Sequence, residues 1–259
     1  MPSDDHGTRG SSRPVRRPGR PTPPPPPYFP GFTPAGVRFW EDLARNNSRS
    51  WFEEHRQVFE REVLAPSRLL VEALGQRLRD IAPAIHADPR VNRSLFRVSR
   101  DTRFSPDKSP YKNHLGLWWW EGAGPRMECS GYYLHLEPPR LMLAAGMHIF
   151  PRQVLAAYRR EAADPRRGKA LLAAVATVEA RACQVGGLHY QRLPRGVDPG
   201  LPQAELLRHN GLYAMREAAI PAELYTPELV DYCFQRFLDM APLHQWLVEM
   251  TLRADPEGR

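Results

Sequence analysis

The feature that most constrains the fold is a change in the spacing of apolar residues near residue 90. Before that point, apolar side chains recur at helical spacing, as in the stripe of Phe39, Trp40 and Leu43. After it, short apolar or alternating segments follow one another, which is typical of strands. Helical spacing returns beyond residue 150. Helices, then neighbouring strands, then helices indicate an α+β fold with a mostly antiparallel sheet.

Local signals predict where the helices begin. Thr33-Pro34 combines a capping threonine with proline at the first helical position, so a helix should start there. Ser50 and Glu53 match the S-x-x-E pattern of a capping box, which predicts a second helix starting at Ser50. A third should follow from Pro66. The helices predicted after the strands begin at Pro151, Asp164-Pro165 and Thr226-Pro227.

We predict a meander of about four to six strands, flanked by these N-terminal and C-terminal helices. Pro138-Pro139 should join two strands in a tight hairpin, in which Glu137 pairs with Arg140 and His135 with Met142. The segments expected as strands are 95–99, 115–120, 130–137, 141–149, 189–193 and 212–216.

The predicted hairpin has two different faces, because side chains alternate along a strand. One face is wholly apolar and belongs to the core. The other collects glycine and alanine together with His135, Glu137 and His148, our candidates for acid/base catalysis. Such residues could also be ligands of a metal, but no local metal-binding spacing supports this, and we predict no metal and no cofactor. A solvated sheet face is the alternative.

Charged and polar side chains are densest in the segment RVSRDTRFSPDKSPYKNHLG, residues 97–116. Two Ser-Pro pairs stiffen it, which lowers the entropy cost of holding cations ready for an anion. Of the 36 lysines and arginines, only Lys108, Lys112 and Lys169 are lysines. Lysines kept in an arginine-rich chain favour a tight anion pocket or a proton-transfer role. The predicted ligand-binding residues are Arg97, Arg100, Asp101, Arg103, Lys108, Tyr111 and Lys112.

The alternative for this segment is an internal salt-bridge network, in which Asp101 and Asp107 pair with the neighbouring cations. A bidentate pair between Asp101 and Arg100 or Arg103, without an open pocket, would favour that interpretation.

Charge and composition divide the chain into a tail and a domain. Residues 1–30 contain ten prolines, and five arginines against two aspartates, a net charge of +3 out of +7 for the whole chain. We predict a disordered tail over 1–30 and a single α+β domain over 31–254. No stretch has the apolar length of a membrane helix, and we expect no membrane contact. The three cysteines form no disulfide pattern, which fits a cytoplasmic protein.

Three stretches occur in order along the domain: FWEDLARNNSRSWFEEHR, SLFRVSRDTRFSPDKSPYKNHLG and LPRGVDPGLPQAELLRHNGLYAMRE. They resemble a bacterial family known as domain of unknown function 2461, and the similarity runs from about Phe32 to Leu252. The resemblance implies one domain with residues 93–116 as its hallmark. It implies no activity, cofactor or catalytic residue.

The leading functional hypothesis is a cytoplasmic domain that binds a small anionic ligand, phosphorylated ligands included, and that uses His135, Glu137 and His148 if it is an enzyme. The alternative is a nucleic-acid- or protein-binding module that uses the basic tail and the strand containing Trp118, Trp119 and Trp120. The chain has no P-loop and no G-x-S-x-G elbow, and Ser130 has no recognisable triad spacing. The sequence predicts no oligomeric state.

Overall fold

A computed structural model of the chain describes residues 27–254. The tail predicted over 1–30 therefore lies largely outside the described residues. Phe29, within the last residues of that segment, is only 2% exposed and packs edge-on against Phe32, with ring centroids 5.5 Å apart. The apolar core thus includes a residue that precedes the first helix by several positions.

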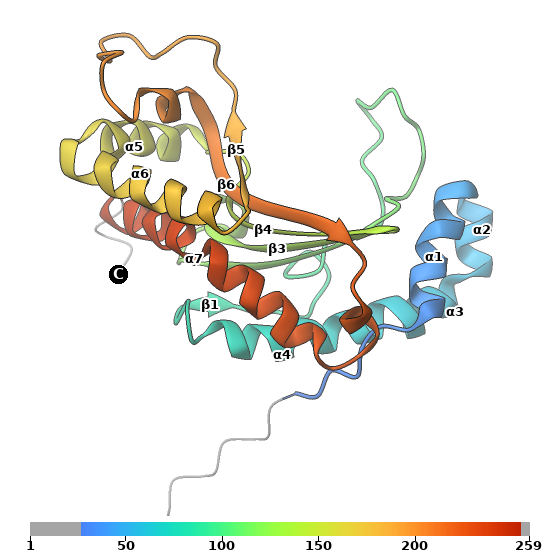
Figure 1. Ribbon diagram of the computed structural model, residues 1–259. Helices are drawn as coiled ribbons and strands as arrows, with labels where there is room; N and C mark the ends of the chain where they lie inside the picture. The colour runs from blue at the N-terminus through green and yellow to red at the C-terminus, as the bar shows by residue number, and fades with distance from the viewer. Residues whose placement is uncertain (1–26, 255–259) are drawn as a thin grey trace, which may run out of the picture.

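The N-terminal third is helical, as the apolar spacing predicts (Figure 1). The Thr33 hydroxyl accepts a hydrogen bond from the backbone N–H of Gly36 at 3.1 Å, which confirms the predicted start of the first helix. The predicted capping box at Ser50 is wrong. Ser48 has the extended backbone of a cap and accepts from the N–H of Trp51, whereas Ser50 already lies in the first helical turn. The elements are α1 (Pro34–Arg45), α2 (Arg49–Glu54), α3 (Arg56–Val58), a π-helical turn (Phe59–Leu64) and α4 (Ala65–Leu78).

The middle of the chain forms a six-stranded antiparallel sheet with the order β1-β2-β3-β4-β6-β5. The β3–β4 hairpin has the predicted pairing of Glu137 with Arg140 and of His135 with Met142. The strand predicted over 189–193 is wrong, since the edge strand β5 ends at Leu188. The strands are β1 (Ile85–His86), β2 (Leu115–Glu121), β3 (Ser130–Glu137), β4 (Arg140–Met147), β5 (Gln184–Leu188) and β6 (His209–Ala219).

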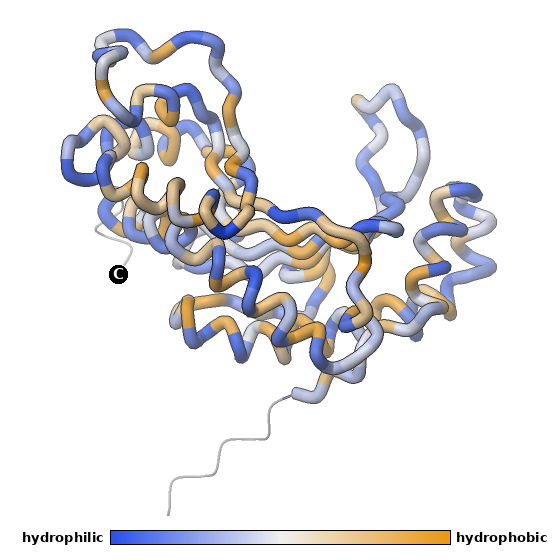
Figure 2. Tube along the Cα trace, in the orientation of Figure 1, coloured by the Kyte–Doolittle hydropathy of each residue, from blue (hydrophilic) through white to orange (hydrophobic). Residues whose placement is uncertain are grey.

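Helices cover one face of this sheet (Figure 1). The long helix α7 (Leu229–Ala254) packs across β3, β4 and β6 and also against α4, while α5 (Arg152–Ala163) and α6 (Pro165–Ala180) pack against α7. Apolar residues follow the strands and the helices beneath them (Figure 2). No helix of the described chain is long and apolar enough to cross a membrane.

Residues 95–100 lie antiparallel to the chain that enters β2, and the two segments form an irregular hairpin. Isolated bridges join Leu95 to Leu117 and Ser99 to Tyr111, so the strand predicted over 95–99 pairs as expected but is not a regular strand. Its tip, residues 101–109, protrudes from the body of the protein (Figure 1) and is largely hydrophilic (Figure 2). This tip-bearing hairpin, residues 95–117, brings the candidate site together with the end of β3.

Candidate functional site: a pocket between the hairpin and strand β3

A pocket of about 700 Å³ opens between the 95–117 hairpin, the loop joining α1 to α2, and the end of β3. It unites two groups of residues that the sequence analysis singled out separately, the cationic segment and the polar face of the β3–β4 hairpin. The pocket is lined by Ala44, Asn47, Arg100, Asp101, Asp107, Ser109, Tyr111, Lys112, Asn113, His114, His135 and Glu137.

Six of the predicted site residues border this pocket and four do not. Arg97 and Arg103 are exposed outside it, and so is Lys108. His148 lies just beyond β4, where it is exposed and its ring faces Tyr213 at 5.4 Å. The six residues that share the pocket are Arg100, Asp101, Tyr111, Lys112, His135 and Glu137.

The tip of the hairpin is held by internal ion pairs. Arg103 binds Asp101 bidentately, with Nε–Oδ1 and Nη2–Oδ2 distances of 3.0 and 2.7 Å. Arg100 pairs with Asp107. Hydrogen bonds from Ser109, together with Arg100, hold the pKa of the Asp107 carboxyl well below its usual range. The salt-bridge alternative therefore describes the tip, and Arg100, Asp101 and Asp107 of that network also line the pocket. Lys112 lies outside the network.

Lys108 and Lys112, the two lysines of the segment, have different surroundings. Lys108 is exposed and donates to the carbonyl oxygen of Thr102 at 3.0 Å. Lys112 is half-buried on the pocket wall, 5.2 Å from the centre of the Phe96 ring. Burial, and then the positive charges of Arg97 and Arg126, lower the pKa of Lys112. Within residues 27–254 the Lys112 ammonium forms no salt bridge and no hydrogen bond.

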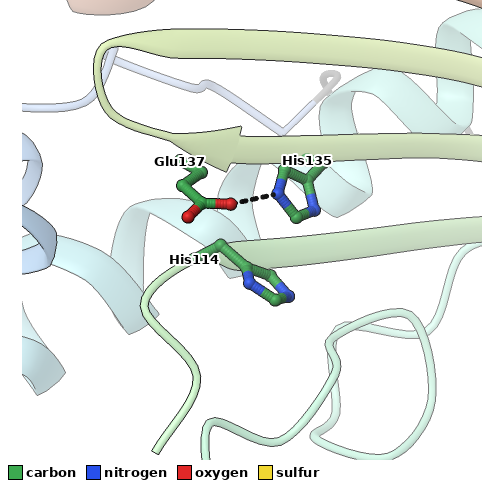
Figure 3. Close-up of side chains that lie close together, drawn as sticks. All are labelled: His114, His135 and Glu137. Carbon is green, nitrogen blue, oxygen red and sulfur yellow. Dashed lines mark hydrogen bonds and ion pairs between the residues drawn. The ribbon is translucent and has the colours of Figure 1, made fainter. Parts of the chain in front are cut away.

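Three residues of the lining, His114, His135 and Glu137, lie close together (Figure 3). His135 and Glu137 extend from the same face of β3, and His135 Nε2 is 3.1 Å from Glu137 Oε2. His114 stands just before β2, and its ring stacks on that of His135 with centroids 4.1 Å apart. The three side chains therefore meet because β2 and β3 are paired neighbours.

Neighbouring groups orient this cluster. The Asn113 amide donates to Glu137 Oε1 at 2.7 Å, and the Tyr133 hydroxyl lies 3.2 Å from His135 Nδ1. Burial and the nearby Glu137 carboxylate raise the pKa of Tyr133 to about 12, so its hydroxyl is neutral. Burial, and then the charge of His135, lowers the pKa of His114 to about 4, so this imidazole is neutral near pH 7. The cluster thus contains the neutral imidazole of His114, together with the His135 imidazole and the Glu137 carboxylate, each of which is oriented by a hydrogen bond.

His114 was not among the predicted site residues, because its place depends on the register of β2 and β3, which no local spacing reveals. Gly116 pairs with His135 across these strands, so the residue two positions earlier falls on the same face beside Glu137. The position of Gly116 also matters sterically, because a Cβ there would lie 2.9 Å from the Tyr133 hydroxyl oxygen.

A second polar cluster lies buried beneath the sheet. The Ser130 hydroxyl is 2.9 Å from His244 Nδ1, and His244 Nε2 is 2.8 Å from Glu121 Oε2. This order of hydroxyl, imidazole and carboxylate matches a serine-hydrolase triad, and sequence spacing gave no sign of it. Ser130 and His244 are 0% exposed, so a substrate cannot reach the hydroxyl. We interpret the cluster as a structural network that joins α7 to β2 and β3.

The tryptophan strand is mostly packing. Trp119 is 0% exposed and donates to the Val71 carbonyl, and Trp120 is buried with its ring stacked on His86. Trp118 is half-buried and donates to the Arg126 carbonyl. Two of the three rings therefore present no free face on which a base could stack.

A comparison with protein families decides the membership of the chain. Residues 35–246 match the family described as conserved hypothetical protein (DUF2461). The chain belongs to the DUF2461 family. No curated protein and no solved structure matches it. The DUF2461 match covers the hairpin, β3 and the pocket between them, so the candidate site lies inside the region that the chain shares with the family.

Proposed function

We propose that this pocket binds a small anionic ligand, and that Lys112 is its principal cationic contact. The observation that carries the proposal is the half-buried Lys112 ammonium, which lines the pocket without a carboxylate partner in the described chain. A partly desolvated cation gains more from a charge-assisted hydrogen bond than an exposed one does. An anionic oxygen that reaches Lys112 would supply the missing partner.

The surroundings of Lys112 favour a compact ligand with several negative oxygens, such as a phosphate group. Arg126, which lies over the Phe96 ring at 4.8 Å, and Arg97 are outside the pocket lining but add positive charge near Lys112. Arg100 lines the pocket but is already paired with Asp107. Ser109 and Tyr111 also belong to the lining. Cationic and polar side chains around one pocket suit a group that accepts several hydrogen bonds at once.

If the ligand reacts, His135 and Glu137 are the acid/base candidates. His135 Nε2 and Glu137 Oε2 are 3.1 Å apart on the pocket wall, within reach for proton transfer between them. We place the domain in the cytoplasm, since Cys129, Cys183 and Cys233 are free, buried thiols that suit a reducing compartment.

A thermal-shift panel tests the proposal. Inorganic phosphate, pyrophosphate, citrate and acetate are each added at constant ionic strength to the full chain and to its Lys112→Gln variant. We expect phosphate or pyrophosphate to raise the Tm of the wild-type protein in a saturable manner, and to raise that of Lys112→Gln much less. Equal shifts in both proteins, or no shift with any multivalent anion, would contradict the proposal.

A further inference from the structure

We propose that His114, His135 and Glu137 form a binding site for a divalent transition-metal ion, with Zn²⁺ as the ion that fits the donors best. Two imidazoles and one carboxylate are a donor set that transition metals favour over Mg²⁺ and Ca²⁺. The inference goes beyond the binding of an anion, because the ion would bind whether or not an anion is present.

The spacing of the donors fits a common ion. One ligand atom from each residue can be chosen so that all three lie within 4.8 Å of one another. Donors that share a tetrahedral zinc at about 2.1 Å are about 3.4 Å apart, and His135 Nε2 and Glu137 Oε2 are already 3.1 Å apart. Closing the site requires rotation of the His114 ring, with no change in the pairing of β2 and β3.

The second observation is that the supporting hydrogen bonds occupy the outer atoms, while the inner atoms of His135 and Glu137 contact only each other. Asn113 binds Glu137 Oε1, and the Tyr133 hydroxyl binds His135 Nδ1. The atoms left facing each other are Glu137 Oε2 and His135 Nε2 (Figure 3). Such outer partners fix the ring and the carboxylate in most metal sites. Among the described residues, the ring nitrogens of His114 have no hydrogen-bond partner at all.

The pairing of the carboxylates also favours a cation in this cluster. Asp101 is paired with Arg103, and Asp107 with Arg100. Among the described residues, Glu137 is the lining carboxylate that has no arginine or lysine partner, so its negative charge is available to a metal ion. Three protein ligands leave at least one coordination position open, as in catalytic zinc sites. Because the three donor residues all line the pocket, an anionic oxygen or a water molecule in the pocket could take that position.

Cobalt provides the test, because Co²⁺ takes zinc sites and its visible absorption reports the number and type of ligands. The tag-free full chain, stripped with a chelator, is titrated with Co²⁺ in a buffer without phosphate, and Zn²⁺ is then added. We expect saturation at one equivalent, with bands typical of four or five ligands, and displacement by Zn²⁺. His135→Ala and Glu137→Gln should weaken Co²⁺ binding more than tenfold.

The matched control is His148→Ala, which removes an exposed histidine outside the pocket. It should bind Co²⁺ as the wild-type protein does. Binding that is lost equally in His148→Ala, or is the same in Glu137→Gln and wild type, would overturn the metal site. Because Glu137→Gln preserves the shape of the side chain, it keeps the test valid if His135→Ala fails to fold. If the metal proposal fails, the anion-binding measurements on Lys112→Gln still stand, so the two proposals fail separately.

Discussion

Asn47 and Tyr111 lie 64 positions apart in the chain and are joined by two hydrogen bonds. The Asn47 amide donates to the Tyr111 carbonyl at 2.9 Å and accepts from the Tyr111 N–H at 3.1 Å. The Tyr111 ring also stacks on Phe52 of α2, with centroids 4.2 Å apart. One side chain thus pairs with the hairpin as a strand would. The pocket has a defined wall because the N-terminal helices hold the hairpin at this point.

Replacing Asn47 should therefore loosen that wall. In Asn47→Ala the backbone N–H and carbonyl of Tyr111, which are half-buried, lose their partner. We expect a loss of about 1–3 kcal/mol in the free energy of unfolding, measured by urea denaturation, and faster proteolysis within 97–112. The control is Asn46→Ala, because the exposed Asn46 amide only donates to Asp42 in its own helix. An equal loss in the two variants would show that Asn47 does not hold the hairpin.

The buried network of Ser130, His244 and Glu121 makes a second prediction. Glu121 accepts from the backbone N–H of Ala84 at 3.0 Å and contacts His244 at 2.8 Å. Glu121→Ala leaves His244 Nε2 buried without a partner and removes the acceptor of the Ala84 N–H, and should destabilise the fold by about 2–4 kcal/mol. Glu121→Gln keeps a carbonyl oxygen and an amide in the same place and should cost less than half as much.

Glu128→Ala is the matched control for that network. Glu128 is half-buried in a neighbouring turn, and its side chain has one exposed hydrogen bond, from Gln153 at 3.3 Å. Thermal or urea unfolding should give a change of less than about 1 kcal/mol. A Glu121→Ala protein as stable as the wild type would mean that the network does not join α7 to the sheet.

The pKa of His114 predicts how stability depends on pH. It is about 4 in the fold and 6.5 in an unperturbed histidine, because burial and then the charge of His135 disfavour protonation. The charges of Lys112 and Arg100 act in the same direction, and that of Glu137 opposes them. Between these pH values the unfolded chain binds more protons, so the free energy of unfolding rises with pH. The contribution is present above about pH 6.5 and is lost as pH falls to about 4.

After allowance for the partial exposure of the ring, His114 should account for about 2 kcal/mol of the stability lost between pH 7.5 and 4.5. Urea unfolding of His114→Gln at both pH values should show a smaller fall in the free energy of unfolding than in the wild-type protein, and the difference should be about that amount. His148→Gln, at an exposed position, should show the same loss as the wild-type protein. If the stability of His114→Gln depends on pH as that of the wild-type protein does, His114 is not the neutral, half-buried imidazole that we assign.

The sequence predicted best the parts in which local pattern and tertiary structure agree. The register of the β3–β4 hairpin was predicted to the residue, because a two-residue turn and strict alternation allow a single register. Ser50 was predicted as the cap because Glu53 completes the S-x-x-E pattern, whereas the cap in the structure is Ser48, which Trp51 follows three positions later. The edge strand β5 begins with Gln184-Val185-Gly186-Gly187, which carries little strand propensity, and it forms through pairing with β6.

The site was predictable in its parts but not in its assembly. His135, Glu137 and Lys112 stood out by residue type, and they meet because residues 95–117 fold back beside β3. His114 and the Ser130–His244 contact depend on register and on a separation of 114 positions, which no local spacing reveals. The pairing of Arg103 with Asp101 likewise removes a cation that composition alone counted as free.

The most direct test of the account compares the two lysines of the hairpin. Isothermal titration calorimetry measures the affinity of pyrophosphate for the wild-type protein, Lys112→Gln and Lys108→Gln at one ionic strength. Removing the partly buried Lys112 should weaken binding at least about tenfold, as expected for the loss of a charge-assisted hydrogen bond. Removing the exposed Lys108 should change it less than about twofold. Equal weakening in the two variants, or none in Lys112→Gln, would contradict an anion site at the base of the hairpin.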